Sequence, residues 1–249
     1  MAPILSARAV RKIYRTGTQE VEALRGIDLD IEPGEMVMVM GPSGNGKTTM
    51  LNCLSGLDDI DEGEVYVDGE EIHSMKDSVR TEHRAQRMGF IFQSFNLIPV
   101  FTAIENVELP LLVTGVKAKE ARDRARAIME RVELGDRTTH KPTELSGGEQ
   151  QRVAIARALV SDPAIVWADE PTGNLDSYTA DAVLALLHEV HDQGQTLVVI
   201  THDAGIGASG TRLVQVRNGE IVYDGLPADI PAEALGHGAP AGSVTGAAR

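Results

Sequence analysis

The segment MVMVMGPSGNGKTT, residues 36–49, places glycines, a lysine and two threonines directly after a short apolar run. Gly41, Gly46, Lys47 and Thr48 fit the spacing G-x-x-x-x-G-K-[ST] of a phosphate-binding loop. In such a loop the backbone N–H groups surround the α- and β-phosphates, the lysine reaches the β- and γ-phosphate oxygens, and the threonine hydroxyl binds Mg²⁺. The residues predicted to contact the nucleotide here are Gly41, Ser43, Gly44, Asn45, Gly46, Lys47, Thr48 and Thr49.

Two acidic residues, Asp169 and Glu170, follow a second apolar run, AIVWA. A carboxylate at the end of a buried strand beside the phosphate-binding loop can hold Mg²⁺ through water, and this is the role predicted for Asp169. Glu170 is the candidate to orient or deprotonate the attacking water. Two acids alone at a strand end would more simply be surface residues, so it is their combination with the loop that favours catalysis.

A third stretch, LSGGEQQRVAIARAL at residues 145–159, combines helix-capping residues with two glycines. Ser146 and Glu149 have the spacing of a capping box at a helix start. Gly147 and Gly148 are unexpected there, because each glycine in a helical turn costs on the order of 1 kcal/mol relative to alanine. Glycines leave the N–H groups at the positive end of the helix dipole open to a phosphate. From these residues alone, either a well-capped helix start or an anion site remains open.

The elements that must position these residues follow from their hydrophobic patterns. The continuous apolar runs MVMVM (36–40), AIVWA (164–168) and LVVI (197–200) predict parallel strands covered on both faces. A helix around residues 177–191 connects the last two runs, which gives a βαβ arrangement and a doubly wound α/β core.

Other segments predict antiparallel strands and helices. GIDLDIEPGE alternates as a half-buried strand does, with Ile27, Leu29 and Ile31 on one face. The segments 64–72 and 213–225 predict hairpins that turn at Asp68-Gly69 and Asn218-Gly219. Residues from about 95 to 160 are predicted to be mainly helical, and they include an amphipathic helix over KAKEARDRARAIMERVELG that ends at Gly135.

Composition limits the class of protein. A chain of 249 residues is one large domain or two small ones, and 42% hydrophobic residues are ordinary for a soluble protein. The net charge of −14 disfavours nucleic acid as a partner. The single cysteine, Cys53, excludes an internal disulfide and suits a reducing cytoplasm. No apolar run reaches transmembrane length, so we expect any membrane role to come through a partner.

The motifs GPSGNGKTT, FQSFNLIP, LSGGEQQR, WADEPTGNLDS and ITHD, in this order, resemble the ATPase subunit of ATP-binding cassette (ABC) systems over residues 4–225. LSGGE is similar to the signature of that family. The stretches GFIFQSFNLIPVFTAIENVELPLL and DEPTGNLDS are most similar to the MacB/LolD/FtsE group, which serves macrolide export, lipoprotein release and cell division. The Ala/Gly/Pro-rich residues 226–249 predict a flexible tail.

The resemblance implies a fold and a division of the chain. The fold class is α/β: a P-loop NTPase (RecA-like) core with a parallel sheet, an N-terminal antiparallel β subdomain and an inserted α-helical subdomain. The nucleotide-binding domain would span residues 1–225, with the helical subdomain inserted at about 95–160.

The resemblance also implies roles for single residues. Tyr14 occupies the position of the aromatic residue that stacks on adenine, and Gln93 that of the glutamine that senses Mg²⁺ and the γ-phosphate. Asp176 matches the loop that crosses the dimer, and His202 matches the switch histidine. The implied cofactors are ATP and Mg²⁺, with the metal held by Thr48, Gln93 and Asp169.

The signature residues Ser146, Gly147 and Gly148 would contact the γ-phosphate of the nucleotide held by a second subunit. Two ATP molecules would then be enclosed in a head-to-tail homodimer. This resemblance favours the anion-site interpretation of the LSGGE stretch, because closure of the dimer would then depend on the γ-phosphate.

Several residues depart from the pattern or have simpler explanations. Asn45 stands where the family usually has serine, and we expect no loss of binding because asparagine tolerates unusual backbone angles. The stretch THDAGIGASGTRLV is richer in glycine than usual. His188 and His191 lie three residues apart on a helix but lack the further ligands of a zinc site. Cys53 and Trp167 are most simply core residues.

The leading functional hypothesis is an ATP-hydrolysing subunit that powers a separate integral membrane protein, a permease, from the cytoplasmic face of the inner or plasma membrane. It would act in export, in lipoprotein release or as a mechanotransmitter. Residues 94–112, with Phe95 and Phe101, would partly fill the helical subdomain and partly form the docking patch. The alternative is a soluble ABC ATPase acting on nucleic acid or ribosomes, for which tandem cassettes or coiled coils are expected. A small-molecule kinase would not explain the signature.

Overall fold

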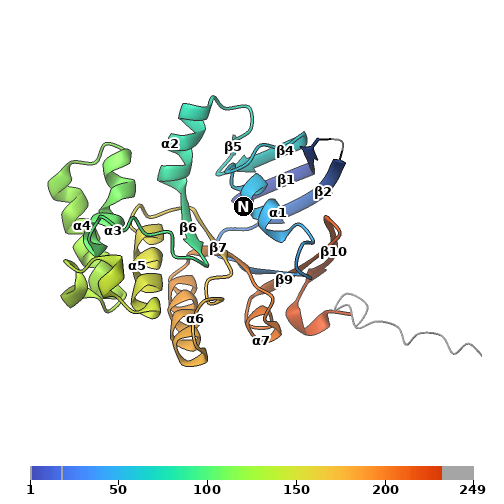
Figure 1. Cartoon of the computed structure of the whole chain (residues 1–249). Helices are drawn as coiled ribbons and strands as arrows, with labels where there is room; N and C mark the ends of the chain where they lie inside the picture. Colours follow the sequence, from blue (N-terminus) through green and yellow to red (C-terminus); the bar gives the residue numbers. More distant parts are fainter. Residues whose placement is uncertain (1, 18, 232–249) are drawn as a thin grey trace, which may run out of the picture.

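The computed structural model describes residues 2–17 and 19–231, which form two sheets with helices around them (Figure 1). The four-stranded antiparallel sheet has the order β2-β1-β4-β5, and the six-stranded sheet has the order β10-β9-β3-β8-β7-β6. The strands of the first sheet are β1 (Leu5–Thr16), β2 (Gln19–Ile31), β4 (Glu62–Val67) and β5 (Glu70–Glu71). Those of the second are β3 (Met36–Met40), β6 (Met88–Phe92), β7 (Ile165–Asp169), β8 (Thr196–Ile200), β9 (Arg212–Arg217) and β10 (Glu220–Gly225).

The larger sheet is the parallel core that the apolar runs predict. Its strands β9, β3, β8, β7 and β6 are parallel, and β10 pairs antiparallel with β9 at one edge. Every residue of β3 and β8 is buried, because helices and the second sheet cover both faces. The helix α1 (Lys47–Leu54) follows β3, and α6 (Ser177–Asp192) connects β7 to β8. The predicted βαβ arrangement is therefore confirmed.

The smaller sheet and both hairpins also follow the sequence. Ile27, Leu29 and Ile31 of β2 are buried against the core, as their alternation predicts. The turns at Asp68-Gly69 and Asn218-Gly219 have positive φ at both central residues, with values of 52° and 81° in the first and 50° and 79° in the second. Positive φ at both positions is typical of the two-residue turns that match strand twist, so both predicted hairpins are confirmed.

Three helices between β6 and β7 form a separate layer beside the sheet: α3 (Ala103–Val113), α4 (Ala118–Arg131) and α5 (Gly147–Leu159). Figure 1 shows them gathered beside β6, on the side away from β1 and β2. They enclose a hydrophobic cluster of their own, which includes Val107, Ala125 and Val153. Two short 3-10 turns, η1 (Gly135–Arg137) and η2 (Pro142–Glu144), connect α4 to α5. The segment is mainly helical, as predicted.

The end of α4 differs from the prediction. The helix stops at Arg131, four residues before Gly135, and Glu133 takes the left-handed conformation with φ of 60°. The Leu134 N–H then donates a hydrogen bond to the Met129 carbonyl at 2.8 Å. Gly135 instead begins η1. The expectation that Gly135 ends the helix is wrong, because a non-glycine residue provides the left-handed turn that glycine usually provides.

Two further elements were not anticipated from the sequence. The helix α2 (Asp77–Arg87) precedes β6 and has no buried residue, so it carries no apolar stripe that would predict it. The short helix α7 (Ala204–Gly207) packs on β3. A Cβ atom at Gly207 would lie 2.0 Å from Met40 Sδ, and one at Gly210 would lie 2.5 Å from Met38 Cγ. The extra glycines after His202 therefore allow this segment to approach the β3 methionines closely.

Near the end of the described residues, the chain forms a 3-10 turn, η3 (Pro227–Asp229). Ile230 follows it and packs against a hydrophobic cluster on the larger sheet that includes Met36, Val199 and Leu213. Most of the segment predicted as a flexible tail, 226–249, lies outside the described residues. Among the residues that are described, no helix is both long and apolar enough to span a membrane.

Candidate active site

The glycine-rich loop leaves the carboxyl end of β3 and leads into α1. A Cβ atom at Gly41 would lie 2.1 Å from the Val216 carbonyl oxygen, and one at Gly46 would lie 2.6 Å from the Ala23 carbonyl oxygen. Gly46 also has φ of 96° immediately before the helix. The two glycines of the motif are thus required by close backbone approach, which fixes the path of the loop against β9 and β2.

Lys47, the first residue of α1, is buried within the loop. Its Nζ donates hydrogen bonds to the carbonyl oxygens of Gly41 at 2.8 Å and Pro42 at 3.1 Å. The first turn of α1 contains no acidic residue. A lysine ammonium thus lies at the N-terminus of a helix, and this combination attracts phosphate.

A metal-compatible pair of oxygens lies beside the loop. The Thr48 hydroxyl donates a hydrogen bond to Asp169 Oδ1 at 3.3 Å, which joins α1 to the carboxyl end of β7. Burial raises the pKa of the Asp169 carboxyl, the Thr48 hydrogen bond lowers it, and the negative charge of Glu170 raises it further. A hydroxyl and a carboxylate are oxygen donors of the kind that Mg²⁺ binds together with water and phosphate oxygens, so these residues fit the metal.

Glu170 and His202 meet at the ends of two neighbouring strands, β7 and β8. His202 Nδ1 lies 2.8 Å from Glu170 Oε2, where an imidazole N–H donates to the carboxylate. The Glu170 side chain is 18% exposed and the His202 side chain is 72% exposed. Glu170 has a left-handed φ of 49°, and its N–H donates to the Ile200 carbonyl. The backbone and the histidine together fix the direction of this carboxylate.

Gln93 extends from the chain just after β6 and is held by a residue that sequence reasoning missed. Its Nε2 donates to Asn174 Oδ1 at 3.3 Å, and Asn174 Nδ2 donates to the Gln93 carbonyl at 2.9 Å. Asn174 lies inside the stretch DEPTGNLDS, but its type and position alone did not indicate a contact with Gln93.

One cleft of about 610 Å³ brings most of the predicted site residues together. It is lined by Tyr14, the loop residues 43–49, Gln93 and Glu170. The missed contributors are Val21, Glu22, Ala23 and Arg25 of β2, with Asn218 and Gly219 of the β9–β10 turn. These are ordinary strand and turn residues in the sequence, so no local signal marks them.

Tyr14 forms one wall of the cleft and is supported by two side chains. Its hydroxyl donates to Asp58 Oδ2 at 2.8 Å, and Lys12 Nζ lies 5.1 Å from the centre of its ring. The Tyr14 side chain remains 40% exposed, which leaves ring surface open to a ligand.

The structural reason for an asparagine at position 45 differs from the one expected, whereas the expectation that binding is not lost stays a prediction. Asn45 does not take a left-handed conformation. Its Oδ1 instead accepts a hydrogen bond from the Asn218 N–H at 2.8 Å, and its carbonyl accepts one from the Gly219 N–H at 3.1 Å. The asparagine therefore joins the loop to the β9–β10 turn, which a serine side chain is too short to do in the same way.

The LSGGE stretch begins α5 as its capping pattern predicts. The Glu149 carboxylate accepts from the Ser146 N–H at 2.8 Å, and Ser146 Oγ accepts from the Glu149 N–H at 3.3 Å. A Cβ atom at Gly148 would lie 2.4 Å from Thr179 Cγ2 of α6. Gly148 is therefore also needed for packing, a reason that the sequence did not reveal.

Asp176 lies beside the first turn of α5 and does not line the cleft that contains the phosphate-binding loop. Its carboxylate caps α6 by accepting from the Thr179 N–H at 3.1 Å and the Thr179 hydroxyl at 2.6 Å. Those hydrogen bonds lower the pKa of Asp176. Neither Asp176 nor the residues 146–148 line the cleft at Lys47. A single chain thus assembles two separate groups of predicted ligands.

The other residues considered in the sequence, two histidines, a cysteine and a tryptophan, have contacts that are typical of structural residues. His188 Nε2 contacts Ser209 Oγ, His191 Nδ1 contacts the Gln195 carbonyl, and the described residues contain no cluster of three or more His, Cys, Asp or Glu side chains suited to a metal. Cys53 is buried, and burial raises the pKa of its thiol to about 12. Trp167 is buried in the core.

Comparisons with known proteins all match this chain to ABC transporter proteins. Residues 24–173 match the family model described as ABC transporter. An uncharacterized ABC transporter ATP-binding protein of Thermotoga maritima is 48% identical over 221 residues, which cover 89% of this chain and 94% of the relative. The macrolide export ATP-binding/permease protein MacB of Brucella melitensis is 44% identical over 92% of this chain, but the chain spans only 35% of that relative.

Solved structures agree with the sequence comparisons. The ATP-binding cassette MJ0796, in a dimeric post-hydrolysis state bound to ADP and Pi, aligns with a TM-score of 0.82 and 42% identity. The alignment covers 90% of this chain and 98% of that chain. A second dimeric structure of MJ0796 aligns with the same TM-score and 43% identity. The α/β fold predicted from the sequence is thereby confirmed.

Proposed function

The chain belongs to the family of ABC transporter ATP-binding proteins, and on this basis we propose that it hydrolyses ATP in the cleft at Lys47, with Glu170 as the base. The loop N–H groups and Lys47 would bind the phosphates, and Tyr14 would stack on adenine. Thr48, Gln93 and Asp169 would hold Mg²⁺. The metal, when bound, neutralises charge on the β- and γ-phosphates.

Glu170 would orient the attacking water and accept its proton. His202 donates to the same carboxylate, so it keeps Glu170 Oε2 in place while Oε1 is free to contact the water. The observation that carries this proposal is the convergence of the Glu170–His202 pair and the Thr48–Asp169 pair at the ends of β7 and β8. In doubly wound sheets, ligands bind at this edge.

The test is phosphate release by the Glu170→Gln variant. The amide keeps the shape of the side chain but cannot accept a proton, so we expect hydrolysis to fall by about 100-fold or more while ATP binding is retained. The matched control is Glu220→Gln, which removes the same charge at an exposed position of β10. Hydrolysis by Glu170→Gln at the rate of this control would contradict the assignment.

We further propose that the residues outside the cleft serve a second copy of the chain. At the N-terminus of α5, next to Asp176, Ser146 is exposed and Gly147 is half-buried, whereas Gly148 is buried against Thr179. A head-to-tail dimer would bring this turn to the nucleotide in the partner's cleft, so that two composite sites form. The dimeric structures of MJ0796 support this arrangement.

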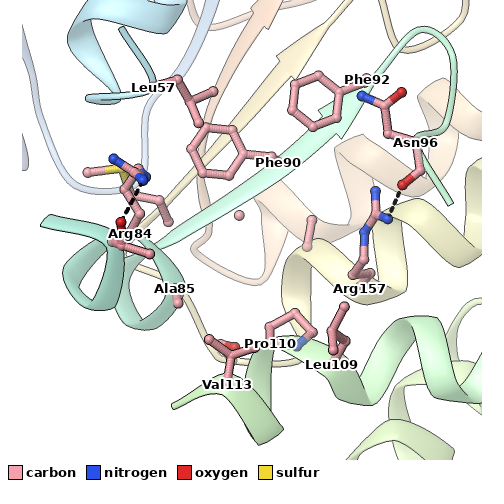
Figure 2. Close-up of a pocket in the computed structure, with 15 residues that line it drawn as sticks. Leu57, Arg84, Ala85, Phe90, Phe92, Asn96, Leu109, Pro110, Val113 and Arg157 are labelled. Atoms are coloured by element: carbon pink, nitrogen blue, oxygen red, sulfur yellow. Dashed lines mark hydrogen bonds between the residues drawn. The ribbon is translucent and has the colours of Figure 1, made fainter. Parts of the chain in front are cut away.

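A groove on another face is the proposed docking site for a membrane permease. It has a volume of about 360 Å³ and is lined mainly by apolar side chains, including Leu57, Phe90, Leu109, Pro110 and Val113. Figure 2 shows side chains from β6, α2, α3 and α5 converging on it. Val113 is 62% exposed, as a docking patch requires. An apolar segment of a permease at the cytoplasmic face of the inner or plasma membrane would fit here.

A further inference from the structure

Arg157, in the second half of α5, holds a loop that lies far from it in the sequence. Its guanidinium donates a hydrogen bond to the Asn96 carbonyl at 2.5 Å (Figure 2) and another to the Phe95 carbonyl at 2.8 Å. Burial lowers the pKa of Arg157 from its usual value. Within residues 2–17 and 19–231, no carboxylate forms an ion pair with this guanidinium, so the two carbonyls provide its polar contacts.

The loop that Arg157 holds has a strained backbone. Phe95 has φ of 59° and Asn96 has φ of 51°, so two consecutive non-glycine residues are left-handed. Asparagine tolerates this conformation, but a bulky residue such as phenylalanine rarely adopts it. Such residues persist only where their surroundings hold them in place. Two hydrogen bonds from a half-buried guanidinium to these two carbonyls meet that requirement.

The position of this loop gives the contact a role. The left-handed pair begins two residues after Gln93, whose side chain lines the cleft at Lys47. A Cβ atom at Gly147 would lie 3.8 Å from the tip of the Phe95 ring, so the same loop also reaches the LSGGE turn. The left-handed Phe95 and Asn96 set the direction of the backbone two residues after Gln93, so a change in their conformation would shift the segment from which the Gln93 side chain extends.

We propose that Arg157 is the positioning residue that holds the loop after Gln93 in its left-handed conformation and so directs the Gln93 amide into the active site. This inference rests on the proposed function of Gln93 at the metal and the γ-phosphate. Arg157 itself does not line the cleft at Lys47. Its removal should therefore change the rate of ATP hydrolysis and the dependence of that rate on Mg²⁺, but not the affinity of the phosphate-binding loop for ATP.

The first experiment compares Arg157→Met and Arg157→Lys with the unmodified chain. We expect kcat to fall about tenfold in Arg157→Met, because the strained loop relaxes. The Mg²⁺ concentration for half-maximal rate should rise several-fold, while binding of a fluorescent ATP analogue stays within about twofold. Arg157→Lys keeps the charge but lacks the planar fork that spans two carbonyls, so it should be intermediate.

The second experiment is a rescue. Glycine adopts the left-handed conformation without strain, so replacing the strained residue by Phe95→Gly in the Arg157→Met background should restore most of the kcat lost, measured against the Phe95→Gly single variant. A control for general loss of stability is Arg212→Met. Its guanidinium donates to the Asp30 carbonyl at 2.8 Å, away from the cleft, so this variant should have a lower Tm but an unchanged kcat at 25 °C.

Two results would overturn the proposal. One is an unchanged kcat and Mg²⁺ response in Arg157→Met, or in Arg157→Lys if the methionine variant does not fold. The other is a loss of kcat that Phe95→Gly does not restore, since the loss then does not come from the strained loop conformation. An unmodified chain without Glu170-dependent phosphate release would instead contradict the proposed function, which separates the two failures.

Discussion

At the scale of single residues, the active site holds groups in conformations or environments that are unfavourable elsewhere. Glu170 has a left-handed backbone although it is not glycine, and burial raises the pKa of Asp169. Both features reduce the stability of the fold, and in the proposed mechanism both would serve chemistry, because a directed base and a desolvated carboxylate act more strongly on water and metal. A site of this kind trades stability for activity.

Replacing Asp169 tests whether burial of its carboxylate lowers the stability of the fold. A carboxyl whose pKa is raised by folding stabilises the protein below the unfolded-state pKa of about 3.8, and this contribution is lost as the pH rises through the folded-state pKa. We therefore expect the nucleotide-free Asp169→Asn variant to melt about 1–3 °C higher at pH 7, with the gain vanishing near pH 3.8. Calorimetry at the two pH values measures it, and a lower Tm at pH 7 would refute the expectation.

At the scale of elements, the close contact between α5 and α6 depends on one glycine. The absence of a side chain at Gly148 lets the first turn of α5 lie against Thr179. Thr179 is also bound to Asp176, the cap of α6, so it cannot move aside freely. A charged substitution at Gly148 would therefore combine this steric clash with any repulsion of phosphate, whereas Gly147 has room for a Cβ atom.

We predict that Gly148→Ala lowers the free energy of unfolding by about 2 kcal/mol because of this overpacking. Adding Thr179→Ser should recover most of the loss, because serine lacks the clashing Cγ2 atom but keeps a hydroxyl that can donate the hydrogen bond to the Asp176 carboxylate. Urea unfolding provides the measurement, and Gly147→Ala is the matched control, with a change of a few tenths of a kcal/mol. Equal stabilities for Gly148→Ala and Gly147→Ala would show that the packing explanation is wrong.

The elements that could be predicted from the sequence are those with a strong local pattern. Apolar runs located β3, β7 and β8, and Asn218-Gly219 located a hairpin turn, because burial and backbone conformation act on adjacent residues. The polar helix α2 left no such signal. The site was partly predictable for the same reason: motif spacing located Lys47 and Asp169. Contacts between distant segments, such as Asn45 with Asn218, depend on the assembled fold and have no local signal.

At the scale of the whole molecule, the two groups of predicted ligands lie on separate parts of the surface. The cleft at Lys47 contains the phosphate-binding loop, and the α5 turn with Asp176 lies outside it. A chain with net charge −14 also repels a second copy. In the proposed dimer, a γ-phosphate bound between the lysine of one copy and the α5 N-terminus of the other would offset this repulsion.

The most direct test of composite-site ATP hydrolysis is the mass of the Glu170→Gln variant, measured by light scattering on a sizing column with Mg²⁺ and ATP. The account predicts a dimer of twice the 26.7 kDa chain with ATP and a monomer with ADP. Adding Gly147→Asp should abolish the dimer, because a carboxylate there repels the γ-phosphate, whereas adding Gly147→Ala should preserve it. A monomer that holds ATP, or a dimer unaffected by Gly147→Asp, would contradict the account.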